Sequence, residues 1–144
     1  MGTGFTEANE EMNAQTDSKK YINNASATGS VKSYEWSKAV TADLIEEEEV
    51  IAYMADIGRT MKTGGDCETE HVTVHLNKPV NGKDNTFYAR KIGVSVAISS
   101  FSDNDGEMQM EGELLGRGDI IEGEFDTKTR TFTEKAAITT NPTE

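Results

Sequence analysis

Three residues could bind zinc or perform nucleophilic chemistry: Cys67, His71 and His75. The histidines are four residues apart in a segment that alternates like a β-strand, so they share one face. At about 3.3 Å per residue they are roughly 13 Å apart, too far to bind one zinc ion together. No helix N-terminus or positioned base is predicted beside Cys67 to activate its thiol. We therefore expect two half-exposed strand histidines, an inert cysteine, no metal site and no cofactor.

Two acidic segments could bind a divalent cation through carboxylate oxygens, Glu46–Glu49 and Asp103–Gly106. Consecutive glutamates on a helix fan around its axis and cannot converge on one ion, whereas a helix N-terminus accounts for them. An EF-hand register with Gly106 at the glycine position requires acidic residues where Phe101 and Gly112 stand. The second segment is therefore predicted to be a hairpin turn, because Asp-Gly supplies residues with positive φ.

Gly116–Asp119 contains Arg-Gly-Asp, which we interpret as a tight turn between two strands. The sequence has no nucleophile elbow, no phosphate-binding glycine loop and no Cys-x-x-Cys pair. These patterns favour a protein that is not an enzyme, and we expect no catalytic residues.

A row of polar residues alternates with apolar ones on two predicted neighbouring strands. Its members are Gln109, Glu111, Glu113, Glu122 and Glu124. Alternation in a strand puts them on one face. In a monomer this is a solvated face, whereas in a ring of subunits it becomes a continuous anionic wall that a polyanion can pass without binding. The pattern leaves both interpretations open.

The elements that position these residues are mostly strands. Val31–Thr41 is predicted to put Tyr34, Trp36, Lys38 and Val40 on one face. Further strands are predicted at Glu70–Leu76, Phe87–Phe101, Glu107–Leu115, Ile120–Phe125 and Arg130–Lys135. In the first of these the alternation predicts that Val72, Val74 and Leu76 point inward, and in the second it puts Ile92, Val94, Val96 and Ile98 on one face. The expected fold class is mainly β (α+β by count), an antiparallel β-sandwich or open barrel with one flanking helix.

The flanking helix is predicted at residues 43–61. Asp43 is a suitable N-cap, and Glu46 three residues later completes a capping-box pattern. An apolar stripe at helical spacing forms the expected packing face, and Gly64-Gly65 ends the helix. The stripe consists of Val50, Met54, Ile57 and Met61.

Three regions are expected along the chain: a polar N-terminal arm at 1–30, a β-sandwich domain at 31–138 and a loose tail at 139–144. The arm has few large apolar residues. It is either a disordered tail or a segment that orders on a neighbouring subunit, with Tyr21 and Ile22 as its anchor.

Composition adds two bounds. The chain has 26 acidic and 14 basic residues, so its net charge of −12 opposes binding to nucleic acid and to anionic membranes. Only 35% of the 144 residues are apolar, which indicates burial completed against a partner. The polar start from Met1 to Gln15 has no secretory pattern, so we expect synthesis in the cytoplasm.

Several stretches between residues 20 and 134 form a set of strand, turn and small-residue patterns. In the first half they are Tyr21-Ile22-Asn23, Ser30–Tyr34, Asp43-Leu44-Ile45, Val50–Tyr53 and Ile57-Gly58-Arg59. In the second half they are Ala89–Val96, Gly112-Glu113-Leu114, Glu122–Asp126 and Thr131-Phe132-Thr133. Together these stretches resemble the tail tube proteins of long-tailed (siphovirus-type) bacteriophages of Gram-positive bacteria.

The resemblance implies a structural subunit of a virion tail, assembled in the host cytoplasm. Six copies would join their inner sheets into a β-barrel ring, and stacked rings would form a conduit for genome DNA, which passes without specific binding. Other tail proteins would bind the tube ends. Phe87–Phe101 and Glu107–Leu115 would line the lumen, and 1–30 would bridge successive rings. The alternatives are a ligand- or sugar-binding β-sandwich module of a virion, with Trp36 as its aromatic platform, and the inner tube of a contractile injection device.

Overall fold

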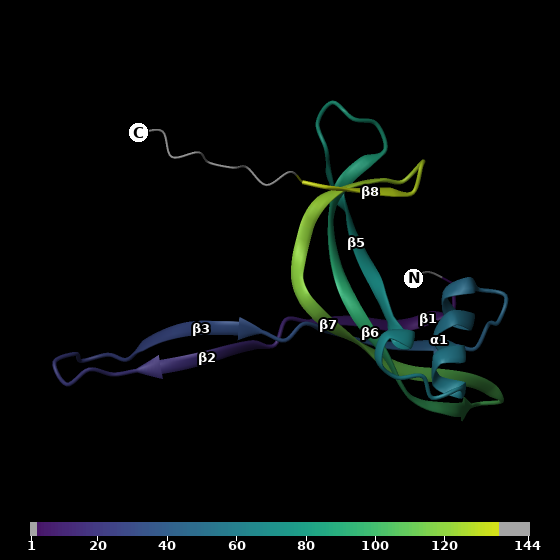
Figure 1. Cartoon of the computed structure of the whole chain (residues 1–144), viewed down its shortest axis with the longest axis horizontal. Helices are drawn as coiled ribbons and strands as arrows, with labels where there is room; N and C mark the ends of the chain where they lie inside the picture. Colours follow the sequence, from purple (N-terminus) through teal and green to yellow (C-terminus); the bar gives the residue numbers. More distant parts are fainter. Residues whose placement is uncertain (1–2, 136–144) are drawn as a thin grey trace. The chain divides into compact units, whose positions relative to one another are not determined.

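The computed structural model describes residues 3–135, which form eight strands, one α-helix and one short 3₁₀ helix (Figure 1). In chain order they are β1 (Phe5–Glu11), β2 (Ala14–Lys19), β3 (Thr28–Tyr34), β4 (Ser37–Asp43), α1 (Glu49–Arg59), η1 (Gly64–Cys67), β5 (Glu68–Pro79), β6 (Thr86–Asn104), β7 (Glu107–Asp126) and β8 (Thr131–Glu134). The expected tail at 139–144 lies outside the described residues.

The fold class is the expected one, mainly β and antiparallel with one flanking helix. A six-stranded sheet has the order β1-β4-β7-β6-β5, with β8 paired to β7, and β2 and β3 form a second, two-stranded sheet. The chain divides into two compact units. Unit 1 comprises Met1–Thr69 and Val94–Gly116, and unit 2 comprises Glu70–Gly93 and Arg117–Glu144.

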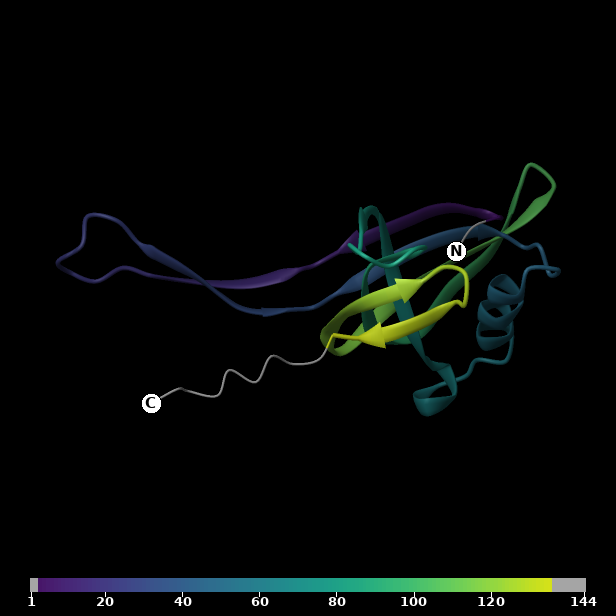
Figure 2. The same cartoon turned by 90° about the horizontal axis from the view of Figure 1, so that it is seen from above.

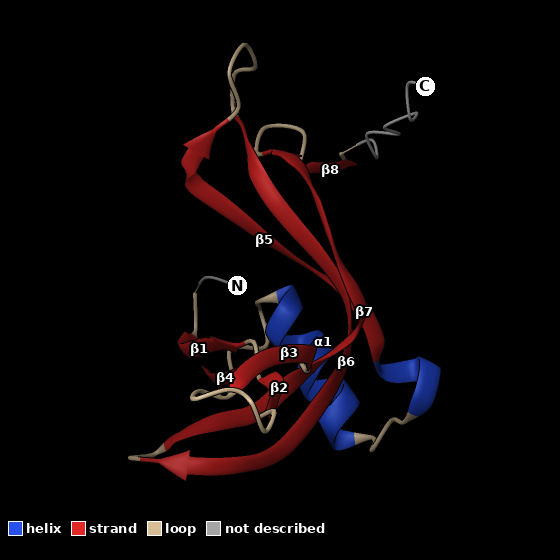
Figure 3. Ribbon diagram, turned by 90° about the vertical axis from the view of Figure 1, so that its left-hand side faces the viewer, coloured by secondary structure: helices blue, strands red, loops and turns tan. Residues whose placement is uncertain are grey.

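The core of unit 1 lies between α1 and one face of the sheet (Figure 3). The sheet contributes every second residue of its strands, as the period of two requires. From β4, β6 and β7 these are Val40, Ala42, Val94, Val96, Met110 and Leu114, all buried. The helix contributes Ile51, Met54, Ala55 and Ile57. The predicted inward set of Phe87–Phe101 is thereby largely confirmed.

The helix is shorter than the predicted 43–61, and the capping-box prediction is wrong. Asp43 ends β4, where its Oδ1 accepts a hydrogen bond from Gln109 Nε2 at 3.0 Å and its N–H donates to Gly4 O. Since its side chain is engaged by the sheet, it cannot cap a helix. The N-cap is Glu48, which makes no side-chain capping bond.

The helical packing face is rotated by about one residue from the predicted stripe. Ile51, Met54 and Ala55 are buried, whereas Val50 is exposed and Met61 is 84% exposed. Gly58 completes the face, because a Cβ there would lie 2.7 Å from Cγ2 of Ile98. Of the predicted packing residues, only Met54 and Ile57 are buried.

The helix ends before the predicted glycine pair. Met61 adopts φ 51°, Lys62 N–H donates to Ile57 O at 3.1 Å, and Met61 N–H donates to Gly58 O at 3.3 Å. This is a Schellman motif, in which the left-handed position is usually glycine. Gly64 and Gly65 belong to η1 instead.

The predicted strand Val31–Thr41 is two strands, β3 and β4, that belong to different sheets. The connection contains Trp36, which is only 7% exposed, while Tyr34 is 64% exposed. The alternation predicts that Tyr34 and Trp36 lie on one face, and this is wrong, because one side chain is exposed and the other is buried.

β7 is one continuous strand, so the turn predicted at Gly116–Asp119 is wrong. Gly116 N–H donates to Trp36 O at 2.8 Å, which holds this part of β7 to the residue just before the start of β4. Gly118, with φ +79°, provides a backbone irregularity within the strand rather than a reversal. The chain reversal predicted at Asp103–Gly106 is confirmed, since Asp105 and Gly106 have φ 52° and 85°.

Unit 2 contains the predicted hairpin of Ile120–Phe125 with Arg130–Lys135, formed by the end of β7 and β8. Asp126 begins its turn and accepts hydrogen bonds from the N–H groups of Thr129 and Lys128. These bonds hold the pKa of Asp126 below its usual value. In β5, Val72 and Val74 are half-buried, but Leu76 is exposed, contrary to the predicted inward alternation.

The N-terminal region does not form a single arm, because its strands belong to two different sheets. β1 pairs with β4 in the main sheet, so residues 5–11 belong to the sandwich and the boundary predicted at residue 30 is wrong. β2 and β3 form a hairpin that projects from unit 1 as a two-stranded ribbon (Figures 1 and 2). We call residues 14–34 the ribbon.

Candidate functional site

The ribbon is the most exposed element of unit 1. Every residue from Ala14 to Glu35 is exposed except Asp17, which is half-buried and forms an ion pair with Lys32 at 3.1 Å. The predicted anchor residues lie at its tip, where Tyr21 is 59% exposed and Ile22 fully exposed. An isolated two-stranded hairpin is marginally stable in water. The ribbon therefore presents apolar side chains that the described chain does not cover.

The charge of the ribbon also differs from that of the chain. It contains three lysines, Lys19, Lys20 and Lys32, and a single acidic residue, Asp17, in a chain with net charge −12. Lys19 and Lys20 directly precede the exposed pair Tyr21-Ile22. Sequence reasoning missed these lysines, although their concentration in an acidic chain is a visible signal.

The predicted carboxylate row lies on one strand, β7, and is divided between the two units. In unit 1, Glu111 and Glu113 are exposed and alternate with the buried Met110 and Leu114. Gln109 is half-buried against Asp43. The prediction of two neighbouring strands is therefore wrong, whereas the alternation in unit 1 is confirmed.

The carboxylates of unit 1 continue across neighbouring strands. Residues directly opposite one another in an antiparallel pair share a face. Glu111 pairs with Thr41, and Thr41 pairs in turn with Glu7 of β1. We call this surface, opposite the helix-covered core, the carboxylate face. Its acidic residues are Glu7, Glu11, Asp43, Glu111 and Glu113. Glu7 was not predicted, because no local pattern connects β1 with β7.

In unit 2 the two remaining glutamates are held by neighbours. Glu122 accepts a hydrogen bond from Tyr88 Oη at 2.7 Å, which raises the pKa of the Tyr88 phenol. Glu124 forms an ion pair with Lys83 at 2.6 Å. These contacts make them part of the local structure of unit 2.

Each residue considered for metal or nucleophilic chemistry has its own local contact. His75 Nε2 accepts a hydrogen bond from Arg90 Nε at 3.1 Å, and His71 contacts Thr73. Cys67 is buried in η1, with its Sγ 3.2 Å from Gly64 O. Within residues 3–135, no group of three or more His, Cys, Asp or Glu side chains is arranged to hold a metal ion.

Trp36 cannot act as an exposed aromatic platform. Its ring is buried, and its Nε1–H donates to Glu10 Oε1 at 2.6 Å. Stacking on a sugar needs an accessible ring face. The residue on which a carbohydrate-binding role was based is thus a core residue of unit 1.

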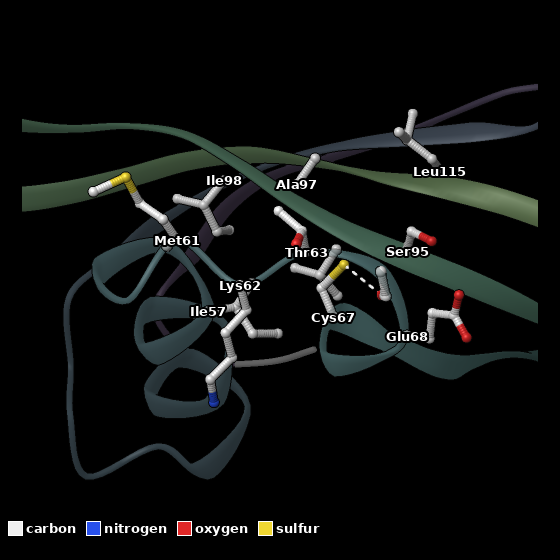
Figure 4. Close-up of a pocket in the computed structure, with 13 residues that line it drawn as sticks. Ile57, Met61, Lys62, Thr63, Cys67, Glu68, Ser95, Ala97, Ile98 and Leu115 are labelled. Carbon is white, nitrogen blue, oxygen red and sulfur yellow. Dashed lines mark hydrogen bonds between the residues drawn. The ribbon is translucent and has the colours of Figure 1, made fainter.

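A pocket of 470 Å³ opens beside the C-terminal end of α1 (Figure 4). The helix end and η1 form one side, and β6 forms the other. Its apolar lining includes Ile57, Met61, Cys67, Val96 and Ile98. All of its lining residues belong to unit 1. No sequence pattern predicted it, because its walls come from segments about 30 residues apart.

The surroundings of the pocket are acidic. Lys62 Nζ is 2.6 Å from Asp56 Oδ2, and the hydrogen bond to Asp56, with a further contribution from Asp66, raises the pKa of Lys62. Glu68 lines the pocket as well. The one lysine that lines the pocket, Lys62, is thus already paired with Asp56.

In the described part of the chain, no helix has the length and apolarity needed to cross a membrane. Neither a scan against protein-family models nor a search of curated proteins finds a significant match to this chain.

Proposed function

We propose that this chain is a structural subunit that assembles with copies of itself into a hollow tube, as a tail tube subunit of a long-tailed bacteriophage. The observation that carries the proposal is the ribbon. A two-stranded element with exposed Tyr21, Ile22, Val31 and Tyr34 gains burial only against another molecule. Retaining such an element is costly in a monomer and useful in an assembly.

The edges of the sheet support the same proposal. β1 ends the strand order on one side and β5 on the other, so each has an edge available for further pairing. A neighbouring copy that adds strands at these edges would extend the sheet, and closing it into a ring would leave no open edge. Glu7, Glu10 and Glu11 of β1 would meanwhile limit uncontrolled pairing, because charged residues protect exposed edges.

The carboxylate face supports a conduit. Glu111 and Glu113 are exposed on a strand whose other face is the core. Repeated around a ring, this face would repel DNA phosphates, so a polyanion could move past without binding. We assign the lumen wall to this face. Glu122, which is held by Tyr88, and Glu124, which is held by Lys83, are assigned a structural role in unit 2.

Negative-stain electron microscopy of the concentrated, mildly warmed protein tests this function. We expect hollow tubes or rings from the full chain. A variant in which Lys20–Ala27 is replaced by Asn-Gly keeps the β2–β3 pairing but loses the apolar tip. We expect that variant to remain folded, by circular dichroism, and to form no tubes.

The matched control is Ser26→Ala, which alters an exposed residue of the same turn without removing Tyr21 or Ile22. It should assemble like the full chain. A full chain that stays monomeric at every concentration and temperature would overturn the proposed function.

A further inference from the structure

We infer that the tip of the ribbon, Lys19–Ile22, inserts into the pocket beside the C-terminal end of α1 on a second copy of the chain. This inference rests on the proposed function, because it names the surface through which neighbouring subunits bind. The segment that binds is the basic and apolar tip of one copy, and the site that receives it is the pocket in unit 1 of another copy.

The first step of the argument is apolar complementarity. Ile22 is the most exposed of the large apolar residues of the described chain, and Tyr21 lies beside it. The pocket offers Ile57, Cys67 and Ile98 as its lining and the exposed Met61 at its margin. Its volume of 470 Å³ is large enough for an isoleucine or tyrosine side chain.

The second step is charge complementarity. The tip has Lys19 and Lys20 immediately before Tyr21. Asp66 acts electrostatically on Lys62, which lines the pocket, and Lys62 itself is already bound to Asp56. A basic tip that approaches this acidic margin would be attracted to it.

The third step is direction. The ribbon extends to the left of unit 1 in Figure 1, whereas α1 lies on the right. Figure 2 shows the same separation from above. The tip of one copy therefore points away from its own pocket, so the pocket it fills must belong to another copy. Such a contact joins two different surfaces, and repeating it propagates an assembly.

Disulfide trapping tests this contact directly, because Cys67 lines the pocket and is the only cysteine of the chain. In Ile22→Cys, a seated tip brings the new thiol next to Cys67 of the second copy. We expect oxidised glutathione to produce disulfide-linked multimers about tenfold faster than in Ser33→Cys, because seating raises the effective concentration of the two thiols. Ser33 is an exposed residue at the base of the same ribbon.

Two further variants keep the test decisive. In the first, Ile22→Cys is combined with Cys67→Ala, and we expect the cross-link to disappear because its partner thiol is gone. A cross-link that persists would join two tips to each other and would overturn the inference. Ile22→Cys with Met61→Cys and Cys67→Ala places the second thiol at the exposed margin of the pocket and should cross-link again. Peptide mapping identifies the linked residues.

The outcomes separate this inference from the proposed function. Tubes in which neither residue 67 nor residue 61 cross-links to residue 22 would overturn the inference and leave the tube function standing. Cross-linked 22–67 pairs in a protein that forms no rings or tubes would support the contact and contradict the function.

Discussion

At the scale of single residues, Trp36 determines how β3 and β4 separate. Its indole is buried in unit 1 and bonded to Glu10, while its carbonyl accepts a hydrogen bond from Gly116 N–H. One residue thus connects β1, the start of β4 and the middle of β7. The strand pattern of Val31–Thr41 contains none of these long-range contacts.

We predict that Trp36→Phe lowers the free energy of unfolding by about 1.5 kcal/mol, because a part-buried hydrogen bond to the carboxylate of Glu10 is lost. Trp36→Ala should cost about 3–5 kcal/mol through the cavity it leaves. Urea denaturation followed by circular dichroism measures both. Tyr34→Phe is the matched control, since Tyr34 is exposed in the ribbon and should change little. Equal effects at the two positions would contradict the role of Trp36.

At the scale of elements, the C-terminal end of α1 depends on the backbone conformation of one residue. The motif that ends it needs a left-handed residue, and Met61 occupies that position at φ 51°. A left-handed conformation costs a non-glycine residue about 1–2 kcal/mol. The side chain is 84% exposed, so it gains little packing within unit 1 in return.

We therefore predict that Met61→Gly raises the free energy of unfolding by about 1 kcal/mol, since glycine adopts this conformation without strain. Gly64→Ala is the matched control, for which we expect a lower free energy of unfolding. Gly64 has φ +60° in open space, so alanine there should cost about 1 kcal/mol through strain alone. Thermal unfolding measures whether each variant is more or less stable than the original chain. A less stable Met61→Gly variant would show that the Met61 side chain packs against other residues in solution.

At the scale of the whole molecule, charge opposes association. Every copy contributes a net charge of −12, and the carboxylate face adds Glu111 and Glu113 where a ring would bring copies together. Screening acts over about 10 Å at 0.1 M salt. Assembly driven by apolar burial should therefore require salt.

We predict that Glu111→Gln with Glu113→Gln lowers the salt concentration at which tubes form. The control is Glu47→Gln with Glu48→Gln, which removes the same charge from exposed residues before α1. Sedimentation across a salt series compares the two. If both pairs shift assembly equally, net charge alone matters and the assignment of the lumen wall to the carboxylate face is wrong.

The sequence by itself determined what depends on near neighbours. The alternation of Ile92, Val94 and Val96 predicted the inward face of β6, and Asp105-Gly106 predicted its hairpin turn. The existence of one helix followed from apolar spacing in the same way. Such features arise from backbone preferences and side-chain period within a few residues, so a local pattern contains them.

Only the tertiary structure decided where the elements begin, end and meet. Asp43 could not cap the helix because Gln109 holds it, and β7 passes through Gly116–Asp119 because Trp36 accepts a bond from Gly116. The carboxylate face needed the register of β1, β4 and β7, and the pocket needed η1 beside β6. Each depends on contacts between residues far apart in the chain, whose free energy outweighs local preference and which no local pattern encodes.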